Sequence, residues 1–213
     1  MIQKLNDGLK KLSLDLKESQ IAQLEGYIDA VLEFNKSYNL MKADSDDELA
    51  VNHILDSLAA VPHIKKIAGE SLVQIGDIGS GGGCPGIPLS IAFPQFKFTL
   101  VERMEKRCVF LENVIKKLAL KNVSVMCVQA DSVPPESFDI AVFRAFHPFD
   151  KKIIKLLLKL IKKNGTLAAY KARSEKISAE MDSIKMIVKD YEKIPLTVPF
   201  LEDHERNLVV IRK

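Results

Sequence analysis

A glycine-rich segment in the middle of the chain, DIGSGGGCPG from Asp77 to Gly86, has the composition of a ligand-binding loop. Six of its ten residues are glycine or proline, and it directly follows an apolar stretch. Glycine has no side chain, so such a backbone can approach a ligand closely and adopt positive φ angles. The last six residues also satisfy the pattern G-x-G-x-x-G, which dinucleotide-binding loops share. The segment indicates a cofactor site, although a loop that serves only the fold can have the same composition.

Two features of this segment disfavour a dinucleotide. Pro85 and Pro88 lie where the following helix should begin, and neither has an N–H group to offer a pyrophosphate. The spacing D-x-G-x-G-x-G, which begins at Asp77, also places a carboxylate beside the loop, where it would repel a pyrophosphate. A carboxylate suits a ligand that carries an amino group and a positive charge. S-adenosylmethionine has a sulfonium, an amino group and no phosphate, and it is the cofactor that this pattern predicts.

Acidic residues also end the next two predicted strands. Glu102 ends the run FKFTLVE, roughly two dozen residues after Gly79, where an acid commonly pairs with the hydroxyls of a cofactor ribose. Asp131 ends the run VSVMCVQAD and is placed to lie against an adenine. A single acid at the end of a strand is usually only solvated. Three such acids beside one glycine-rich loop favour a cofactor site.

Strands that alternate with helices after residue 69 must position these residues. The predicted strands are LVQIGDIGS, FKFTLVE, VSVMCVQAD, FDIAVFRAF and GTLAAYKA, followed by an antiparallel pair, YEKIPLTVPFLE and RNLVVIRK. The helices between them are IPLSIAF, MEKRCVFLENVIKKLAL, FDKKIIKLLLKLIKK and residues 174–189. This order predicts an α/β fold of Rossmann-like type, with a mostly parallel seven-stranded sheet and helices on both faces.

The first 68 residues show only helical patterns. Leucines recur at helical spacing over residues 5–16, and a second helix is expected to start at Ser19. A third is expected from Ser45, where Glu48 completes a capping box. We therefore expect a small helical domain over residues 1–68 and a cofactor-binding domain over residues 69–213.

The composition argues against several classes of protein. No apolar run is long enough for a signal peptide or a membrane span. Cys84, Cys108 and Cys127 are odd in number and lack C-x-x-C spacing, which argues against a disulfide framework or a metal site and favours a reducing, cytoplasmic location. The net charge of +3 does not by itself indicate a nucleic-acid-binding protein. Nothing in the sequence indicates an obligate oligomer, so a monomer is expected.

Several segments together resemble one known family, the RsmG or GidB family of bacterial 16S rRNA guanine-N7 methyltransferases. HILDSL resembles the family's H-x-L-D-S-L, and DIGSGGGCPGIPLSI resembles its D-x-G-x-G-x-G-x-P-G-I-P-L-x-I. YNLMK, KRCVFL, FRAF, AYKA and HERNLVVIRK resemble further family segments, so the resemblance spans nearly the whole chain. The sequence departs from the pattern at Cys84, Phe143 and Ala172, which bears on details of the cofactor pocket.

The resemblance implies S-adenosylmethionine as cofactor and 16S rRNA, alone or in the small ribosomal subunit, as substrate. Glu102 would bind the ribose, and Ala130 and Asp131 the adenine. Arg144, at the end of the fourth strand, would reach the cofactor or the target base. The residues expected at the cofactor are Asp77, Gly79, Gly81, Gly83, Cys84, Glu102, Ala130, Asp131 and Arg144.

Methylation at guanine N7 would need little chemistry from the protein. This atom has an in-plane lone pair and no proton at neutral pH, so no general base is required. Catalysis would then rest on positioning and on oriented charge, and we expect Arg144 and Lys171 to supply them. His53 and Asp56 lie off the apolar stripe of the third helix, which leaves them either solvated or turned toward the cofactor domain together with Asn39.

Basic residues near the strand ends would bind the RNA. Lys171, Arg173 and Arg206 are the candidates, because cations at the mouth of the site would contact phosphates. Three alternatives remain open from the sequence. They are a methyltransferase that acts on a small molecule or a protein, an NAD-dependent oxidoreductase, and a non-catalytic regulator that binds a partner through the helical domain.

Overall fold

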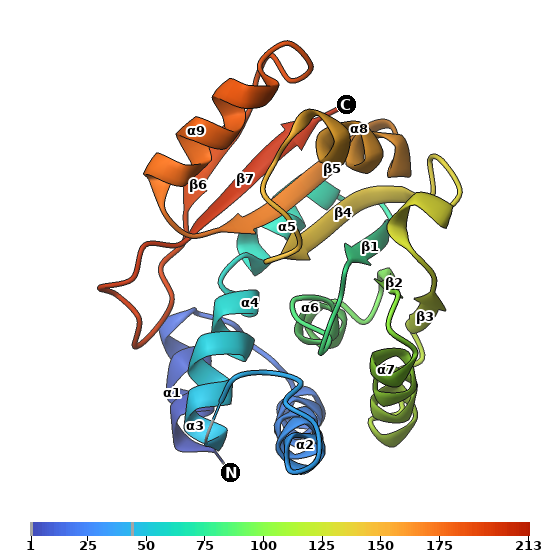
Figure 1. Cartoon of the computed structure of the whole chain (residues 1–213). Helices are drawn as coiled ribbons and strands as arrows, with labels where there is room; N and C mark the ends of the chain where they lie inside the picture. Colours follow the sequence, from blue (N-terminus) through green and yellow to red (C-terminus); the bar gives the residue numbers. More distant parts are fainter. Residues whose placement is uncertain (1, 44) are drawn as a thin grey trace.

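The computed structural model describes residues 2–43 and 45–213, and a seven-stranded sheet forms its centre (Figure 1). The strands are β1 (Gln74–Ile78), β2 (Lys97–Glu102), β3 (Val123–Cys127), β4 (Phe138–Arg144), β5 (Ile161–Lys171), β6 (Glu192–Pro195) and β7 (Asn207–Arg212). Their order in the sheet is β3-β2-β1-β4-β5-β7-β6. Strands β1 to β5 are parallel, and β7 is antiparallel to both β5 and β6. The predicted α/β class and the late antiparallel pair are confirmed.

Helices cover both faces of this sheet (Figure 1). On one face lie α5 (Val61–Ala68), α6 (Gly86–Ala92) and α7 (Glu105–Lys117), and on the other lie α8 (Lys151–Leu160) and α9 (Ser174–Ile184). Successive residues of a strand point to opposite faces, so Leu100 joins the core under α6 and α7 while Val101 joins the core under α8. A buried parallel sheet of this kind explains the continuous apolar runs in the sequence.

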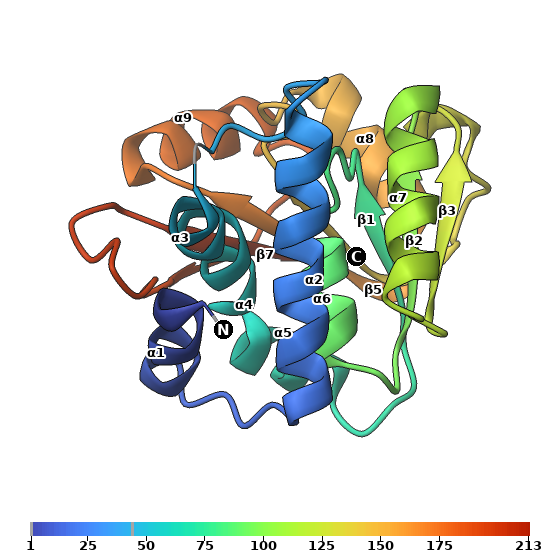
Figure 2. The same ribbon diagram turned by 90° about the horizontal axis from the view of Figure 1, so that it is seen from below.

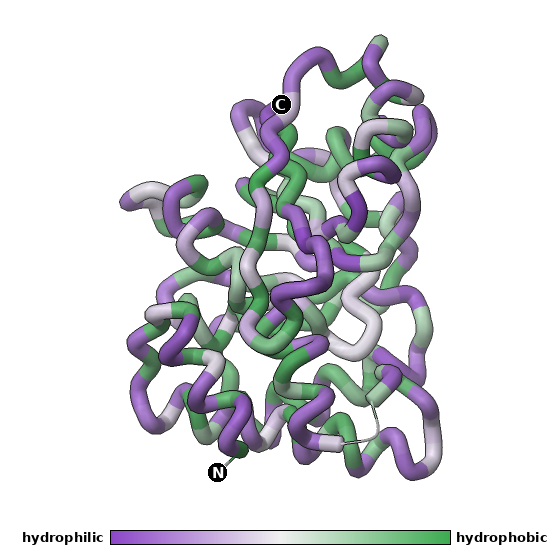
Figure 3. Tube along the Cα trace, turned by 90° about the vertical axis from the view of Figure 1, so that its left-hand side faces the viewer, coloured by the Kyte–Doolittle hydropathy of each residue, from purple (hydrophilic) through white to green (hydrophobic). Residues whose placement is uncertain are grey.

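The N-terminal residues form α1 (Gln3–Lys11), α2 (Glu18–Asn35), α3 (Asp46–Leu49), the π-helical segment η1 (Ala50–Leu55) and α4 (Asp56–Leu58). Helix α2 lies across α6 and beside α7 (Figure 2). Its buried residues Leu24 and Ile28 belong to the same hydrophobic core as Ile87 of α6 and Leu111 of α7. Along the outer helices, hydrophilic and hydrophobic residues alternate (Figure 3), as expected for helices that bury one face. The helical segment therefore packs directly against α6, the helix that follows the glycine-rich loop, and against α7.

Several element boundaries differ from those that the sequence predicts. Helix α8 ends at Leu160 rather than continuing through Lys163, because Ile161 pairs with Phe138 and begins strand β5. Helix α2 begins one residue before the expected Ser19. The expected cap at Ser45 is confirmed, since its hydroxyl accepts a hydrogen bond from the backbone N–H of Glu48. None of the described helices combines the length and the hydrophobicity that crossing a membrane would require.

Candidate active site

The glycine loop, residues 79–86, follows β1 at the carboxyl edge of the sheet. Strand β1 lies between β2 and β4, so the loop sits where the strand order reverses, the usual ligand position in open α/β sheets. Gly79, Gly81 and Gly83 all have positive φ angles, which L side chains rarely adopt. A Cβ atom on Gly79 would also lie 2.3 Å from the ring of Phe146. The glycines are therefore required by the path of this backbone.

Asp77 lies beneath the loop rather than in a cavity. Its Oδ2 accepts hydrogen bonds from the hydroxyl of Ser80 at 2.7 Å and the backbone N–H of Gly86 at 3.0 Å. The side chain is buried, its Oδ1 has no hydrogen-bond partner among the described residues, and burial raises its pKa to about 6. Asp77 thus ties both ends of the loop together and places a buried negative charge under it.

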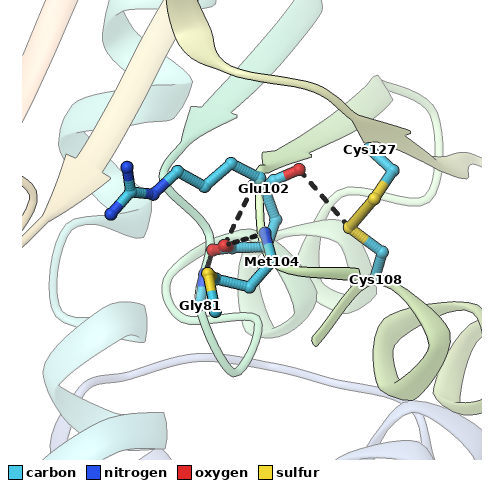
Figure 4. The surroundings of a disulfide bond; sticks show 6 residues. Gly81, Glu102, Met104, Cys108 and Cys127 are labelled. Carbon is cyan, nitrogen blue, oxygen red and sulfur yellow. Dashed lines mark hydrogen bonds between the residues drawn. A yellow bond between two sulfur atoms is a disulfide. The ribbon is translucent and has the colours of Figure 1, made fainter. Parts of the chain in front are cut away.

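Glu102, at the end of β2, holds the loop from the side (Figure 4). Its Oε2 accepts a hydrogen bond from the backbone N–H of Gly81 at 2.9 Å. Its Oε1 accepts from the N–H groups of Arg103 and Met104, both at 2.9 Å. The carboxylate is therefore fixed in place beside the loop, and its remaining lone pairs suit the hydroxyl groups of a ribose.

Two adjoining cavities open on the glycine loop. The first has a volume of about 700 Å³, and the second has about 340 Å³. Both are lined by Gly79, Arg107, Ala145, Phe146 and His147, so these residues mark the passage between them. The first cavity is also lined by Gly81, Cys84 and Arg144, and the second also by Glu102, Ala130 and Asp131.

These cavities fit S-adenosylmethionine. The second cavity offers carboxylates for the ribose hydroxyls and the adenine amino group, and glycine backbone lines the passage into the first cavity. Beyond Gly81 and its two chain neighbours, the Gly79 carbonyl oxygen, at 3.9 Å, is the only described atom within 4 Å of the place that a Cβ on Gly81 would occupy. The space beside the loop is therefore open to a ligand. Among the predicted cofactor residues, Gly83 lines neither cavity. It faces the core instead, where an added Cβ would meet Ile87 and Leu111.

Four predicted polar residues meet in the first cavity. The Asp56 carboxylate accepts from Nη1 of Arg144 at 2.9 Å through Oδ2 and from Nε of Arg206 at 3.0 Å through Oδ1. Nη2 of Arg144 lies 2.7 Å from Nδ1 of His53, and its Nη1 donates to the carbonyl of Asn52 at 3.0 Å. Asp56 is only 4% exposed. A buried carboxylate thus fixes two arginines, one at the end of β4 and one directly before β7.

His53 is neutral in this arrangement. Burial and then the charge of Arg144 lower the pKa of His53 below its usual value. A neutral ring that accepts from Arg144 at Nδ1 donates from Nε2, which lies 3.2 Å from the carbonyl oxygen of Lys42. The alternative that Asp56 is solvated is wrong, because the helical segment packs against the cofactor-binding part and buries this face. Asn39 is exposed and lines neither cavity.

Of the two other predicted basic residues, Lys171 lines the first cavity and Arg173 does not. Lys171 lines the first cavity, where its Nζ donates to Glu180 at 2.6 Å and lies 4.2 Å from the centre of the Phe149 ring. Arg173 is exposed and lines neither cavity. Among the described residues, no group of three or more His, Cys, Asp or Glu side chains is placed to hold a metal ion.

Sequence reasoning missed two tyrosines that hold this site together. The hydroxyl of Tyr27, in α2, donates to the carbonyl of Gly82 at 2.6 Å and lies 3.4 Å from Sγ of Cys84. The hydroxyl of Tyr170, in β5, donates to the carbonyl of Ser57 at 2.8 Å. Both side chains are buried. Tyr27 is part of the apolar stripe of α2, so no local signal separates it from ordinary core residues.

The expectation of no disulfide is wrong in this structure. Cys108 of α7 and Cys127 at the end of β3 form a disulfide (Figure 4), and Cys84 is free and buried. The two cysteines are 19 residues apart, and they meet because α7 packs back against β3. Spacing patterns along the chain could not show this, since the pairing depends on how a helix returns to the sheet.

Solved structures of methyltransferases share this fold. A tRNA methyltransferase from Aquifex aeolicus aligns with a TM-score of 0.58 at 17% identity, over 75% of this chain and 68% of that one. A predicted O-methyltransferase from Agrobacterium tumefaciens aligns with a TM-score of 0.59 at 18% identity, over 75% of this chain and 79% of that one. At this identity the likeness shows the fold alone, which this chain shares with these methyltransferases.

Sequence comparison identifies the family. The model of the GidB family, described as rRNA small subunit methyltransferase G, matches residues 20–209. A ribosomal RNA small subunit methyltransferase G from Treponema denticola is 38% identical over 97% of this chain and 92% of its own length. A protein of the same name from Francisella tularensis is 35% identical over 100% of this chain and 98% of its own. The chain therefore belongs to the GidB family of rRNA small subunit methyltransferase G proteins.

Proposed function

We propose that this protein transfers the methyl group of S-adenosylmethionine to N7 of a guanine in 16S ribosomal RNA. The observation that carries the proposal is the pair of adjoining cavities at the glycine loop. One offers Glu102 and Asp131 to an adenosyl group, and the other presents the arginines held by Asp56. The relatives named as small-subunit rRNA methyltransferases support ribosomal RNA as the substrate, and that substrate would place the protein in the cytoplasm. We further propose that it acts as a monomer.

The cofactor supplies an electrophilic methyl group on a sulfonium, and the chain's own residues supply orientation. The glycine loop, fixed by Asp77 and Glu102, would hold the methyl group at the passage between the cavities. Arg144 would present donors to the acceptor oxygen of the guanine, since arginine reads the O6 and N7 edge of this base. Asp56 and His53 prevent this guanidinium from rotating away.

The ion pairs of Arg144, Arg206 and Lys171 also suit this reaction. Attack by N7 leaves the base positively charged, so free cations beside it would disfavour the product. Asp56 offsets part of the charge of Arg144 and Arg206, and Glu180 offsets that of Lys171. The neutral His53 adds no positive charge. Within this account, Lys171, Arg173 and Arg206 would guide the RNA backbone toward the first cavity.

Nucleoside analysis of ribosomal RNA tests the proposal in cells. A strain that lacks the gene is complemented with the wild-type protein or with an Arg144→Ala variant, and 16S rRNA is digested and analysed by mass spectrometry. We expect 7-methylguanosine to disappear in the deletion strain and to return only with the wild-type protein. Unchanged 7-methylguanosine in 16S rRNA of the deletion strain would contradict the proposal and favour a small-molecule or protein substrate.

A further inference from the structure

Arg107, in the first part of helix α7, occupies a position that the proposed mechanism does not use. It lines both cavities, together with Gly79 and Phe146, and so faces the passage through which a bound cofactor must extend. Glu102, the expected partner of the ribose, lies just before the same helix. The guanidinium of Arg107 is therefore placed at the junction of the adenosyl cavity and the larger first cavity.

The side chain of Arg107 lacks a partner within the described part of the chain. Its Nε is buried, and no side-chain hydrogen bond or ion pair joins Arg107 to residues 2–43 or 45–213. Two other cations of the first cavity, Arg144 and Arg206, contrast with it, because both pair with Asp56. Buried donors in native proteins are almost always satisfied, and an unsatisfied one costs free energy. The orphaned donor therefore indicates a ligand group that accepts hydrogen bonds.

The charges beside the glycine loop indicate which kind of ligand group Arg107 binds. Asp77 and Glu102 place two carboxylates under and beside the glycine loop. A ligand that brings a further negative charge to this loop needs a cation to offset the repulsion, and the planar guanidinium matches a carboxylate best. S-adenosylmethionine carries one carboxylate, at its methionyl end, and the adenosyl end carries none. A phosphate of the RNA backbone fits less well, because Nε of Arg107 is buried at the junction of the cavities.

We propose that Arg107 binds the carboxylate of the methionyl group of the cofactor. This inference rests on the proposed function, since it assumes that S-adenosylmethionine occupies the two cavities. It assigns to Arg107 the recognition of the amino-acid end of the cofactor, while Glu102 recognises the ribose end. Arg107 is thus the residue that distinguishes the intact cofactor from adenosyl compounds without a carboxylate.

Binding measurements with three ligands test this assignment. Dissociation constants for S-adenosylmethionine, decarboxylated S-adenosylmethionine and 5′-methylthioadenosine are measured by calorimetry for the wild-type protein and the Arg107→Gln and Arg107→Lys variants. Lys106→Gln is the matched control, because Lys106 precedes Arg107 and lies over the ring of Tyr38 at 4.2 Å, outside both cavities. It removes the same charge without removing the proposed contact.

We expect Arg107→Gln to weaken binding of S-adenosylmethionine about 10-fold to 100-fold, the range for a hydrogen-bonded charge pair. Binding of the two ligands without a carboxylate should change less than twofold, which also shows that the variant is folded. Arg107→Lys should retain part of the affinity, and Lys106→Gln should retain all of it.

Four outcomes would overturn the inference. An equal loss for all three ligands would assign Arg107 to the adenosyl group or to the fold. Unchanged affinity for S-adenosylmethionine, with a raised KM for ribosomal subunits, would assign it to an RNA phosphate. A wild-type protein that binds none of the ligands would overturn the proposed function as well as the inference. Normal binding by both the wild-type protein and the Arg107→Gln variant would overturn the inference alone.

Discussion

Oδ2 of Asp56 lies 2.9 Å from Nη1 of Arg144, and this ion pair joins the helical segment to the end of strand β4. The same carboxylate also pairs with Arg206, 150 residues further along the chain. Three parts of the sequence therefore meet at one buried acid. The position of the arginines that face the first cavity depends on this contact.

Replacing Asp56 should affect both stability and turnover. Asp56→Ala leaves two partly buried arginines without their carboxylate, and breaking a buried pair in this way costs about 3 kcal/mol. We expect that loss in the free energy of unfolding by urea denaturation, with turnover reduced far more than affinity for S-adenosylmethionine. Asp47→Ala is the control, because Asp47 pairs with Lys4 on the surface and should change stability by less than about 1 kcal/mol. Equal effects of the two variants would show that the pair has no special role.

A side chain at Gly81 should weaken cofactor binding, because Gly81 lines the first cavity. Its φ angle of 60° costs an alanine about 1–2 kcal/mol, but no described neighbour obstructs the added Cβ. We expect Gly81→Ala to fold and to bind S-adenosylmethionine at least tenfold more weakly, since about 1.4 kcal/mol of lost contact suffices. Gly69→Ala likewise places an alanine at a positive φ angle, 59°, with open space around it, and lies outside both cavities. If Gly69→Ala weakens binding equally, backbone strain rather than ligand contact explains the loss.

Asp77 should make stability depend on pH in an unusual direction. Burial raises its pKa from 3.8 to about 6, so the folded protein binds more protons than the unfolded chain between these values. The contribution of Asp77 to stability is therefore greatest below about pH 4 and falls by about 3 kcal/mol as the pH rises to about 6. Urea denaturation of the cofactor-free protein should show this slope, and Asp77→Asn should lack it. Parallel pH profiles of the two proteins would contradict the raised pKa.

Tyr27 should affect cofactor binding indirectly, by holding the glycine loop in place. Removing its hydroxyl in Tyr27→Phe leaves the buried carbonyl of Gly82 without this donor, at a cost of about 1–3 kcal/mol. We expect lower stability in thermal unfolding and weaker binding of S-adenosylmethionine, because the loop is less firmly held. Tyr191→Phe, at a position that is 41% exposed, should change neither quantity. Unaltered affinity in Tyr27→Phe would separate the helical segment from cofactor binding.

Local patterns predicted the order of the elements well, because each strand and helix has its own periodicity. These patterns failed where a contact between distant segments decides which structure a residue adopts or whether it is buried. Ile161 continues a helical pattern but forms strand β5, since Phe138 of β4 offers it a pairing partner. The burial of Asp56 and the pairing of Cys108 with Cys127 likewise depend on packing between elements. The division of the chain at residue 68 stays a prediction.

In the candidate site, too, the sequence predicted some residues and missed others. The glycine loop and Glu102 stand out in the sequence because their types and spacing carry the signal, and the family resemblance points to Arg144 at the end of the fourth strand. Arg107 and Tyr27 do not, since an arginine in a helix and a tyrosine in an apolar stripe are ordinary features of many proteins. The contact of Lys171, Arg173 and Arg206 with RNA stays a prediction, and the exposed position of Arg173 outside both cavities makes it the weakest of the three candidates.

The most direct test of the central claim is transfer of label from methyl-labelled S-adenosylmethionine. Purified protein is offered unmodified small ribosomal subunits, the corresponding naked rRNA and a protein extract in parallel, and labelled RNA is digested to nucleosides. The account predicts label in 16S rRNA, recovered as 7-methylguanosine at a single site, and a loss of that label with Arg144→Ala. Label that appears only in the protein extract, or in another nucleoside, would contradict it.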